Sequence, residues 1–278
     1  MLISGGGSLL QDVTSTQSYK YYSLVMKSAI HFGAKVMVYA NGIGPLNSPK
    51  NREDCKRLLA KVDKITLRDE QSLEELGNIG VEREITVSAD PAFSLKPAFA
   101  GETTDGRYFV ISARKWKKLP VDFADKLAEV CRIIKEKYNI QPVFIPMQSW
   151  MDDEICADIA AKCGGRVSEP FKDVETLIGY IQNSEFVLGM RLHILIYSLS
   201  VNVPIVALSY DPKVDAIVKK WNCFSAYVEK IDVNELVKEV EYIIENKNEI
   251  SASIEETTKI MKEKNVCDAK SAIELMEF

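Results

Sequence analysis

The sequence predicts an α/β protein built from two Rossmann-like domains that face a cleft. Over its 278 residues, short runs rich in β-branched residues alternate with amphipathic stretches, a pattern typical of parallel sheets with helices on their faces. The chain is about twice as long as a single domain of ~150 residues, which favours two domains. Residues 95–106, LKPAFAGETTDG, show no periodicity and are expected to link the domains.

The expected first domain covers residues 1–95. Its strands are expected at residues 2–4, 35–39, 64–67 and 85–87. Its helices are expected at residues 17–32, 49–62 and 69–76. Each strand ends in a loop of small residues, and ligands of open α/β sheets bind beyond the carboxyl ends of the strands. These loops are therefore where we expect the binding residues.

The expected second domain covers residues 107–264. Its strands are expected at residues 108–112, 142–146, 186–189 and 205–208. Its helices are expected at residues 122–138, 151–163, 174–182, 192–200 and 213–221. Residues 233–264 predict two amphipathic helices separated near residues 247–249, followed by a short helix at 269–276. The segment 267–278 is expected to pack back onto the first domain.

Composition excludes several classes of protein. Lys and Arg number 35 against 40 Asp and Glu, a formal charge of −5, and no basic face for nucleic acid is visible. The six cysteines form no C-x-x-C and have no His at ligand spacing, so we expect reduced thiols and no metal site. The N-terminus does not resemble a secretory signal, and no apolar run predicts a membrane span. We therefore expect a cytoplasmic protein.

Glycine-rich loops follow two strands of the first domain. Gly5 and Gly6 lie in SGGGS at residues 4–8, and Gly42 lies in NGIGP at residues 41–45. Glycine allows backbone N–H groups to approach a phosphate or carboxylate closely, although a tight turn explains the same residues. Neither loop has the spacing of a nucleotide fingerprint. With Asp90-Pro91, they form three strand-end loops, which favours the floor of a cleft.

Arg191 and His193 lie in GMRLH at residues 189–193, where a hydrophobic strand meets the next helix. Cations at a helix N-terminus cost roughly 0.3–1 kcal/mol, so stability alone does not favour them there, whereas a bound anion reverses the sign. His193 is one of only two histidines. It is either a packed or surface residue or an acid/base group.

Arg114 and Lys213 follow two other strands of the second domain. Two arginines at matching strand ends can clamp a phosphate or carboxylate with their planar guanidinium groups, although a solvated Arg114 is the simpler alternative. Lys213, in SYDPK at residues 209–213, is either a solvated helix residue or a third cation near the anion. The sequence contains no Ser-His-Asp order, H-x-x-x-H or D-x-D, so hydrolase and metal-dependent mechanisms lack their required residues.

Six ordered motifs resemble the polysaccharide pyruvyl transferase family, particularly bacterial members that act on secondary cell-wall polymer. They are ISGGGSLLQD (3–12), NGIGPL (41–46), RDEQS (68–72), ADPAF (89–93), GMRLH (189–193) and SYDPKV (209–214). The resemblance runs from residue 3 to about residue 220. It implies a glycosyltransferase-B-like fold. Family members begin with a further strand and a G-N-x-G-D-E-type loop, so we expect the first domain to be incomplete at its N-terminus, with an exposed sheet edge.

The resemblance also implies an activity and its residues. A pyruvyl group would pass from phosphoenolpyruvate to a sugar, commonly N-acetylmannosamine, as a 4,6-ketal. His193 would be the acid/base residue. The donor ligands would be Arg114 and Arg191, with Leu192 nearby and Lys213 as a further cation. Asn41 stands where the family frequently has Gln.

The implied donor is phosphoenolpyruvate, without cofactor or metal, and the implied acceptor is a lipid-linked or oligosaccharide sugar. Such an acceptor would bring the protein to the inner face of the membrane as a peripheral contact, and an exposed sheet edge would favour a homo-oligomer. No nucleic acid is expected. Two alternatives remain open: a nucleotide-sugar glycosyltransferase or epimerase of the same architecture, and an inactive binding homologue.

Overall fold

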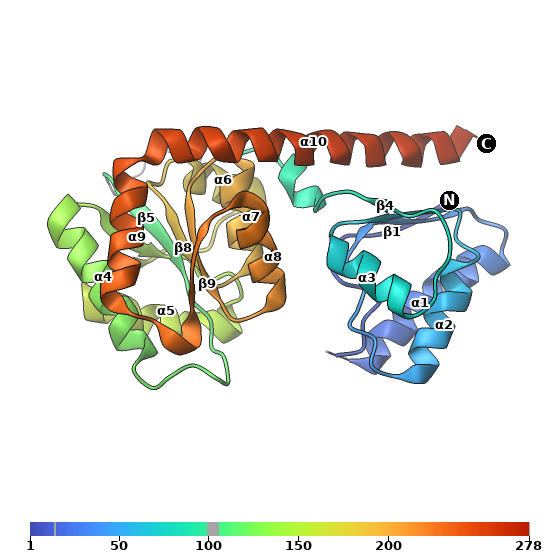
Figure 1. Cartoon of the computed structure of the whole chain (residues 1–278), viewed down its shortest axis with the longest axis horizontal. Coiled ribbons are helices and arrows are strands. Elements are labelled where there is room, and N and C mark those ends of the chain that lie inside the picture. Colours follow the sequence, from blue (N-terminus) through green and yellow to red (C-terminus); the bar gives the residue numbers. More distant parts are fainter. Residues whose placement is uncertain (14, 99–105, 278) are drawn as a thin grey trace. The chain divides into compact units, whose positions relative to one another are not determined.

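The computed structural model describes residues 1–13, 15–98 and 106–277, and these residues form two compact units. The first unit comprises Met1–Ser94 together with Lys259–Phe278, and the second comprises Leu95–Thr258 (Figure 1). Each unit contains one parallel β-sheet with helices packed against it. The alternation of strand and helix that the sequence predicts is confirmed in both.

The first unit contains a four-stranded parallel sheet with the order β1-β2-β3-β4. Its strands are β1 (Leu2–Gly5), β2 (Val36–Asn41), β3 (Lys64–Leu67) and β4 (Thr86–Val87). Its helices include α1 (Thr16–His31), α2 (Pro49–Leu59), α3 (Glu70–Asn78) and the 3-10 turn η1 (Pro91–Ser94). Strand β2 is central and mostly buried, as a strand covered on both faces should be. Strand β1 lies at an edge of the sheet, and its Ile3 side chain is exposed.

Side chains near the start of each helix fix these boundaries. Ser15 accepts hydrogen bonds from the first N–H groups of α1, and Asp69 accepts one from Ser72 in α3. Helix α2 starts differently, because Ser48 makes no side-chain cap. Asp12 instead holds the two residues that precede the helix, because its carboxylate accepts from Asn47 N at 2.8 Å and from Ser48 N at 2.9 Å.

Replacing Asp12 with Asn is expected to lower the unfolding free energy by about 1–2 kcal/mol near pH 7, because the amide offers one oxygen to the two N–H groups. Burial raises the pKa of Asp12, but the hydrogen bonds from Asn47, Ser48 and Asn51 outweigh it, and the pKa lies below its usual value. A lowered pKa gives stability that is present above the pKa of the unfolded chain and lost as pH falls through the folded value.

Thermal melts of the parent and Asp12→Asn between pH 7 and pH 3 measure this effect. The difference between the two melting temperatures should shrink as the pH falls. Glu53→Gln is the matched control in α2, because Glu53 is exposed and its one ion pair among the described residues is with Arg57 at 3.9 Å. A difference that stays constant over this range would contradict a contribution from the ionised carboxylate.

The second unit contains a six-stranded parallel sheet with the order β10-β9-β8-β5-β6-β7. Its strands are β5 (Tyr108–Ser112), β6 (Gln141–Phe144), β7 (Arg166–Val167), β8 (Val187–Gly189), β9 (Ile205–Ser209) and β10 (Phe224–Tyr227). Its helices include α4 (Phe123–Tyr138), α5 (Ser149–Cys163), α6 (Val174–Gln182), α7 (Leu192–Ser200), α8 (Pro212–Trp221) and α9 (Val233–Glu245), with the 3-10 turn η2 (Val228–Lys230). Every residue of β5 and β9 is buried, which explains their uninterrupted apolar sequences.

The register of this sheet aligns the carboxyl ends of its central strands. Ser112 at the end of β5 pairs with Gly189 at the end of β8, and Gly189 pairs with Ala207 in β9. Residues that follow these strands therefore emerge side by side at one edge of the sheet. Strands β7 and β10 were not expected from the sequence, because the first is only two residues long and the second is only partly buried.

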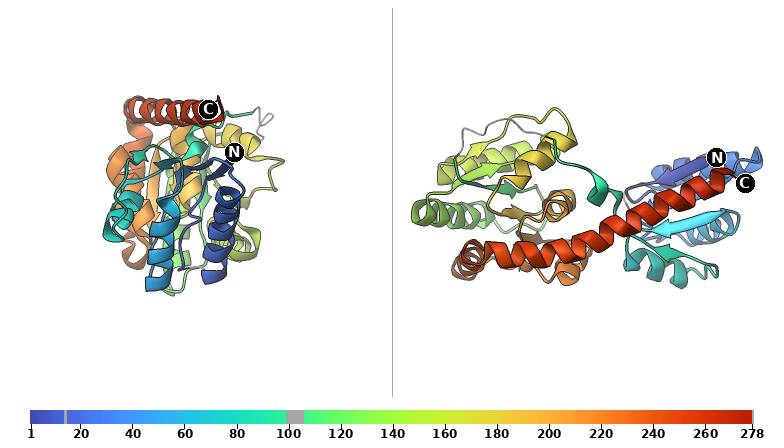
Figure 2. Two further views of the ribbon diagram at one scale, coloured as in Figure 1. Left: turned by 90° about the vertical axis from the view of Figure 1, so that its right-hand side faces the viewer. Right: turned by 90° about the horizontal axis from the view of Figure 1, so that it is seen from above.

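The C-terminal segment differs from the expectation. Residues 247–277 form one continuous helix, α10 (Lys247–Glu277), so the separate helix expected at residues 269–276 is wrong (Figure 2). The reason is local: this segment contains neither Gly nor Pro, so nothing ends the helix once it has started. The break that precedes it lies at Asn246 rather than within residues 247–249.

Helix α10 contributes residues to both units, and the division lies between Thr258 and Lys259 rather than near residue 264. Within the second unit, the Thr258 hydroxyl donates to Leu199 O at 2.9 Å. Within the first unit, Asn265 Nδ2 donates to Asp90 O at 3.1 Å and to Ser94 Oγ at 3.0 Å. The end of the helix therefore belongs to the first unit through specific polar contacts.

The segment expected as a linker, residues 95–106, lies partly outside the described residues, which exclude 99–105. Its first residues are assigned to the second unit, where Ala98 N donates to Glu175 O at 2.9 Å. Across the described ranges, no helix has both the length and the apolar character needed to cross a bilayer.

Candidate active site

The candidate site lies at the carboxyl edge of the sheet in the second unit, where loops from four neighbouring strands meet. Arg114 follows β5, Gln148 follows β6, Arg191 follows β8 and Tyr210 follows β9. These strands are consecutive in the sheet and parallel, so their ends share one edge. Open parallel sheets bind their ligands at this edge.

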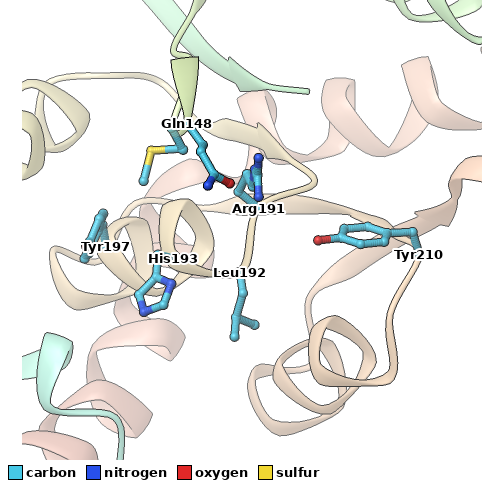
Figure 3. Close-up of a pocket in the computed structure, with 7 residues that line it drawn as sticks. Gln148, Arg191, Leu192, His193, Tyr197 and Tyr210 are labelled. Atoms are coloured by element: carbon cyan, nitrogen blue, oxygen red, sulfur yellow. The ribbon is translucent and has the colours of Figure 1, made fainter. Parts of the chain in front are cut away.

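A cavity of about 460 Å³ opens between these loops (Figure 3). Its lining comprises Met147, Gln148, Arg191, Leu192, His193, Tyr197 and Tyr210. Its volume is in the range of sites for small molecules, ~300–1,000 Å³. Of the residues expected from the sequence, Arg191, Leu192 and His193 therefore lie on one cavity wall, at the start of α7.

Arg191 is held by a buried carboxylate. Asp152, in the first turn of α5, is fully buried, and its two oxygens accept hydrogen bonds from Arg191 Nη2 at 2.6 Å and Nε at 3.0 Å. Asp152 Oδ2 also accepts from the backbone N–H groups of Met147 and Gln148. This two-point pair fixes the plane of the guanidinium group. Arg191 Nη1 bonds none of the described residues, so this part of the guanidinium group remains available to a ligand.

The start of α7 adds a second source of positive potential. Arg191 is the N-cap residue, and its side chain makes no hydrogen bond to the helix backbone. The first N–H groups of a helix have no partner within the helix, and they favour anions. Gly189 permits this arrangement, because a Cβ there would lie 2.7 Å from Ile194 Cγ2. Any larger residue would push α7 away from the end of β8.

His193 lies in the first turn of α7, and its side chain is exposed. Its ring centroid is 5.9 Å from that of Tyr197, one helical turn further along. Figure 3 shows His193 and Leu192 projecting from the start of the helix, with Gln148 and Arg191 also contributing to the cavity. An exposed imidazole in the wall of a cavity is accessible for proton transfer, unlike one packed in the core.

Arg114 does not line this cavity itself but contacts a residue that does. Its Nη1 donates to the Tyr210 hydroxyl at 3.0 Å, and its guanidinium carbon lies 5.3 Å from the centre of the Tyr210 ring. It also lies 5.6 Å from the centre of the Trp116 ring. These contacts hold Arg114 at the same sheet edge as Arg191 and place its charge beside Tyr210.

Lys213 follows Pro212 in the first turn of α8, and its N–H donates to the capping carboxylate of Asp211 at 2.9 Å. The lining of the cavity does not include Lys213. The structure therefore brings it to the correct edge of the sheet but not into the cavity wall.

Gly5, Gly6 and Gly42 lie in the first unit, where they have structural roles. Gly6 has φ +71°, a left-handed conformation that favours glycine. A Cβ on Gly42 would lie 2.7 Å from Ser8 Oγ and 2.9 Å from Arg68 Nε. A side chain at residue 42 would therefore separate the loops after β1 and β3.

Arg68 connects the strand-end loops of the first unit. It is 8% exposed, and it donates to Ser8 Oγ at 3.0 Å and to Asp90 Oδ2 at 3.1 Å. Its Nε donates to Asp69 Oδ2 at 3.2 Å. Because these partners follow β1, β3 and β4, the arginine fixes the carboxyl edge of this sheet. The role of the glycines in ligand binding stays a prediction.

Comparison with known proteins identifies the family. The family model described as polysaccharide pyruvyl transferase matches residues 1–212, which is more than half of the chain. The chain belongs to the polysaccharide pyruvyl transferase family. No curated protein matches the sequence significantly.

Solved structures with the same fold are distant in sequence from this family member. UDP-GlcNAc 2-epimerase from Neisseria meningitidis, bound to UDP-GlcNAc, matches with a TM-score of 0.65 at 13% identity, over 98% of this chain and 76% of its own. MnaA of S. aureus, in a structure with UDP, matches with a TM-score of 0.64 at 13% identity, over 94% of this chain and 71% of its own. These neighbours confirm the predicted fold class of two Rossmann-like, glycosyltransferase-B-like domains.

A third neighbour is larger. The structure of accessory secretory protein 1, 2 and 3 in Streptococcus pneumoniae matches with a TM-score of 0.63 at 13% identity, over 99% of this pyruvyl transferase family member. The match covers 53% of that chain, so the present sequence spans about half its length.

Sequence reasoning missed several residues of the site in this family member. Asp152 had no distinguishing pattern, because an acidic residue in the first turn of a helix is common. Gln148 and Tyr197 also carried no motif. Tyr210 lies inside the SYDPKV motif, and Arg68 begins RDEQS, so the resemblance pointed to these segments without indicating that either residue organises a site.

Proposed function

We propose that this protein transfers a pyruvyl group from phosphoenolpyruvate to a sugar, forming a 4,6-ketal. The observation that carries the proposal is the cavity at the start of α7, where Arg191 and the helix N-terminus favour an anion beside the exposed His193. The family match supports a pyruvyl transferase, and the acceptor we propose is N-acetylmannosamine of a cell-wall polysaccharide precursor.

Phosphoenolpyruvate carries a phosphate and a carboxylate, and the site offers guanidinium or N–H groups that can bind each of them. The Nη1 group of Arg191 and the N–H groups of the first turn of α7 would bind one anionic group. Arg114 lies at the same edge beside Tyr210 and would attract the other. Local positive charge permits this binding although the whole chain has a formal charge of −5.

The chemistry requires proton transfer at two stages. Protonation of C3 of phosphoenolpyruvate makes C2 electrophilic, and one sugar hydroxyl then attacks C2 and loses its proton. The bond between C2 and the bridging oxygen of the phosphate then breaks, and phosphate leaves. The second hydroxyl attacks C2 and closes the ketal. One hydroxyl proton replaces the proton given to C3, and the other leaves with phosphate. His193 would give the first proton and accept one from a hydroxyl, while Arg191 would stabilise the departing phosphate.

The remaining partners are also proposals. A lipid-linked acceptor would bring the protein to the inner face of the membrane as a peripheral contact. The edge strand β1, with the exposed side chain of Ile3, would favour a homo-oligomer. No resident cofactor or metal enters the proposed reaction.

The donor tests the proposal directly. Phosphoenolpyruvate at 100 times its Kd should stabilise the protein by about 2.7 kcal/mol, measured as a shift in melting temperature. UDP-sugars should give a smaller shift. A shift from a UDP-sugar alone would instead favour a nucleotide-sugar enzyme of the same fold, and no shift from either ligand would contradict the proposed donor site.

Arg191→Lys should weaken donor use although the positive charge is kept, because an ammonium group cannot pair with Asp152 at two points and bind an anion with a fixed plane. We expect kcat/KM for phosphoenolpyruvate to fall by about tenfold or more, equivalent to at least ~1.4 kcal/mol. Lys219→Arg is the control, because Lys219 lies near the end of α8, away from the carboxyl edge of the sheet. Equal kcat/KM for Arg191→Lys and the parent would refute this role of the guanidinium group.

A further inference from the structure

A second cavity adjoins the first at the same edge of the sheet. We propose that it binds the ring of the acceptor sugar, an inference that rests on the proposed pyruvyl transfer. Its volume is about 340 Å³, and Tyr210 lines both cavities. A sugar in the second cavity would thus lie next to a donor in the first.

Two parallel strands build this cavity. Tyr227 ends β10 and pairs in register with Ser209, which ends β9. Tyr210 follows Ser209 directly, so the carboxyl ends of the two strands bring both tyrosines to one opening. Tyr227 is 61% exposed although it is a large aromatic residue. Its ring is therefore available to a ligand rather than used in the core.

The cavity has the side chains that recognise a sugar. Aromatic rings pack against the C–H faces of sugar rings, and carboxylates accept hydrogen bonds from hydroxyl groups. Asp211 Oδ1 is used by the N–H of Lys213, and Asp215 Oδ1 is used by the hydroxyl of Ser209. The Oδ2 atoms of both aspartates bond none of the described residues. Two carboxylate oxygens are therefore available beside the tyrosines to accept hydrogen bonds from sugar hydroxyls.

Charge separates the two cavities. Among the described residues, the lining of the second cavity contains Asp211, Asp215 and Glu229 with one cation, Lys230, and Glu229 also pairs with Lys118 at 3.8 Å. This negative balance disfavours phosphoenolpyruvate, whereas a neutral sugar with several hydroxyls is accepted. The first cavity differs because Arg191 and the start of α7 line it, and none of the described residues in its lining carries a carboxylate. The sheet edge can thus hold an anionic donor in the first cavity and a neutral acceptor in the second, and each cavity favours its own ligand.

Ligand-observed NMR with the methyl β-glycoside of N-acetylmannosamine tests this inference. The parent should bind the glycoside, and Tyr227→Ala should weaken its affinity by roughly tenfold through loss of the aromatic contact. Tyr227→Phe should retain it, because the ring remains. Tyr242→Ala is the matched control: this tyrosine is also half-exposed but contacts Phe224, at the opposite end of β10.

A parallel melting experiment with phosphoenolpyruvate distinguishes this inference from the proposed function. The donor should stabilise the parent and Tyr227→Ala equally. If phosphoenolpyruvate did not stabilise the parent, the proposed function would be contradicted. If the glycoside still bound in a way that depended on Tyr227, the second cavity would remain a sugar site. The acceptor assignment would be overturned if the glycoside did not bind the parent, or if it bound the parent and Tyr227→Ala equally. UDP is tested in the same way, and binding of UDP rather than of the glycoside that depended on Tyr227 would also overturn the assignment.

Discussion

His193→Gln is expected to lower kcat by about 10² to 10⁴ while the Kd for phosphoenolpyruvate changes by only a few fold. Glutamine keeps a polar side chain at the cavity wall but cannot exchange a proton near neutral pH. Because Arg191 is oriented by Asp152 and not by the histidine, donor binding should survive the substitution. Steady-state turnover, donor affinity and melting temperature measured on the same variant check this result.

The other histidine provides the control. His31 ends α1 in the first unit and is exposed, so His31→Gln should leave turnover unchanged. Retained turnover in His193→Gln would end the assignment as acid/base residue. Lost donor affinity with intact folding would make His193 a donor ligand instead.

Asp152→Asn is expected to have the second large effect, on stability and on donor use together. The substitution leaves the Arg191 guanidinium, only 14% exposed, without its ionic partner, and turns an amide toward the N–H groups of Met147 and Gln148. Removing one member of a buried ion pair typically costs about 3–5 kcal/mol. We also expect kcat/KM for phosphoenolpyruvate to fall, because Arg191 loses its fixed orientation. Asp152 is thus a positioning residue.

A double-mutant cycle separates positioning from folding. The combined Asp152→Asn and Arg191→Gln variant buries no unpaired charge. Its loss of unfolding free energy should therefore be smaller than the sum of the two single losses by about 0.5–3 kcal/mol. Donor use should not recover, because the guanidinium is absent. Additive stabilities would contradict the pair, and a single Asp152→Asn variant with the parent's kcat/KM would contradict positioning.

Some elements of this fold follow from the local sequence, and others do not. The apolar runs of β5 and β9 predicted their strands because a parallel strand is buried on both faces. Strand β7 escaped prediction because two residues carry no periodicity. Helix α10 was divided wrongly, because its buried face includes the polar residues Thr258, Asn265 and Asp268, which interrupt the apolar pattern.

The sequence by itself determined the alternation of strands and helices, and with it the position of Arg191 and His193 just after a strand. These are local properties, because hydrophobic periodicity and strand ends are encoded within a few residues. Only the tertiary structure decided that β5, β8 and β9 are neighbours, that Asp152 holds Arg191 across 39 residues of sequence, and that Lys213 stays outside the cavity wall. The physical reason is that strand order sets which loops meet, and contacts between distant side chains follow from that order.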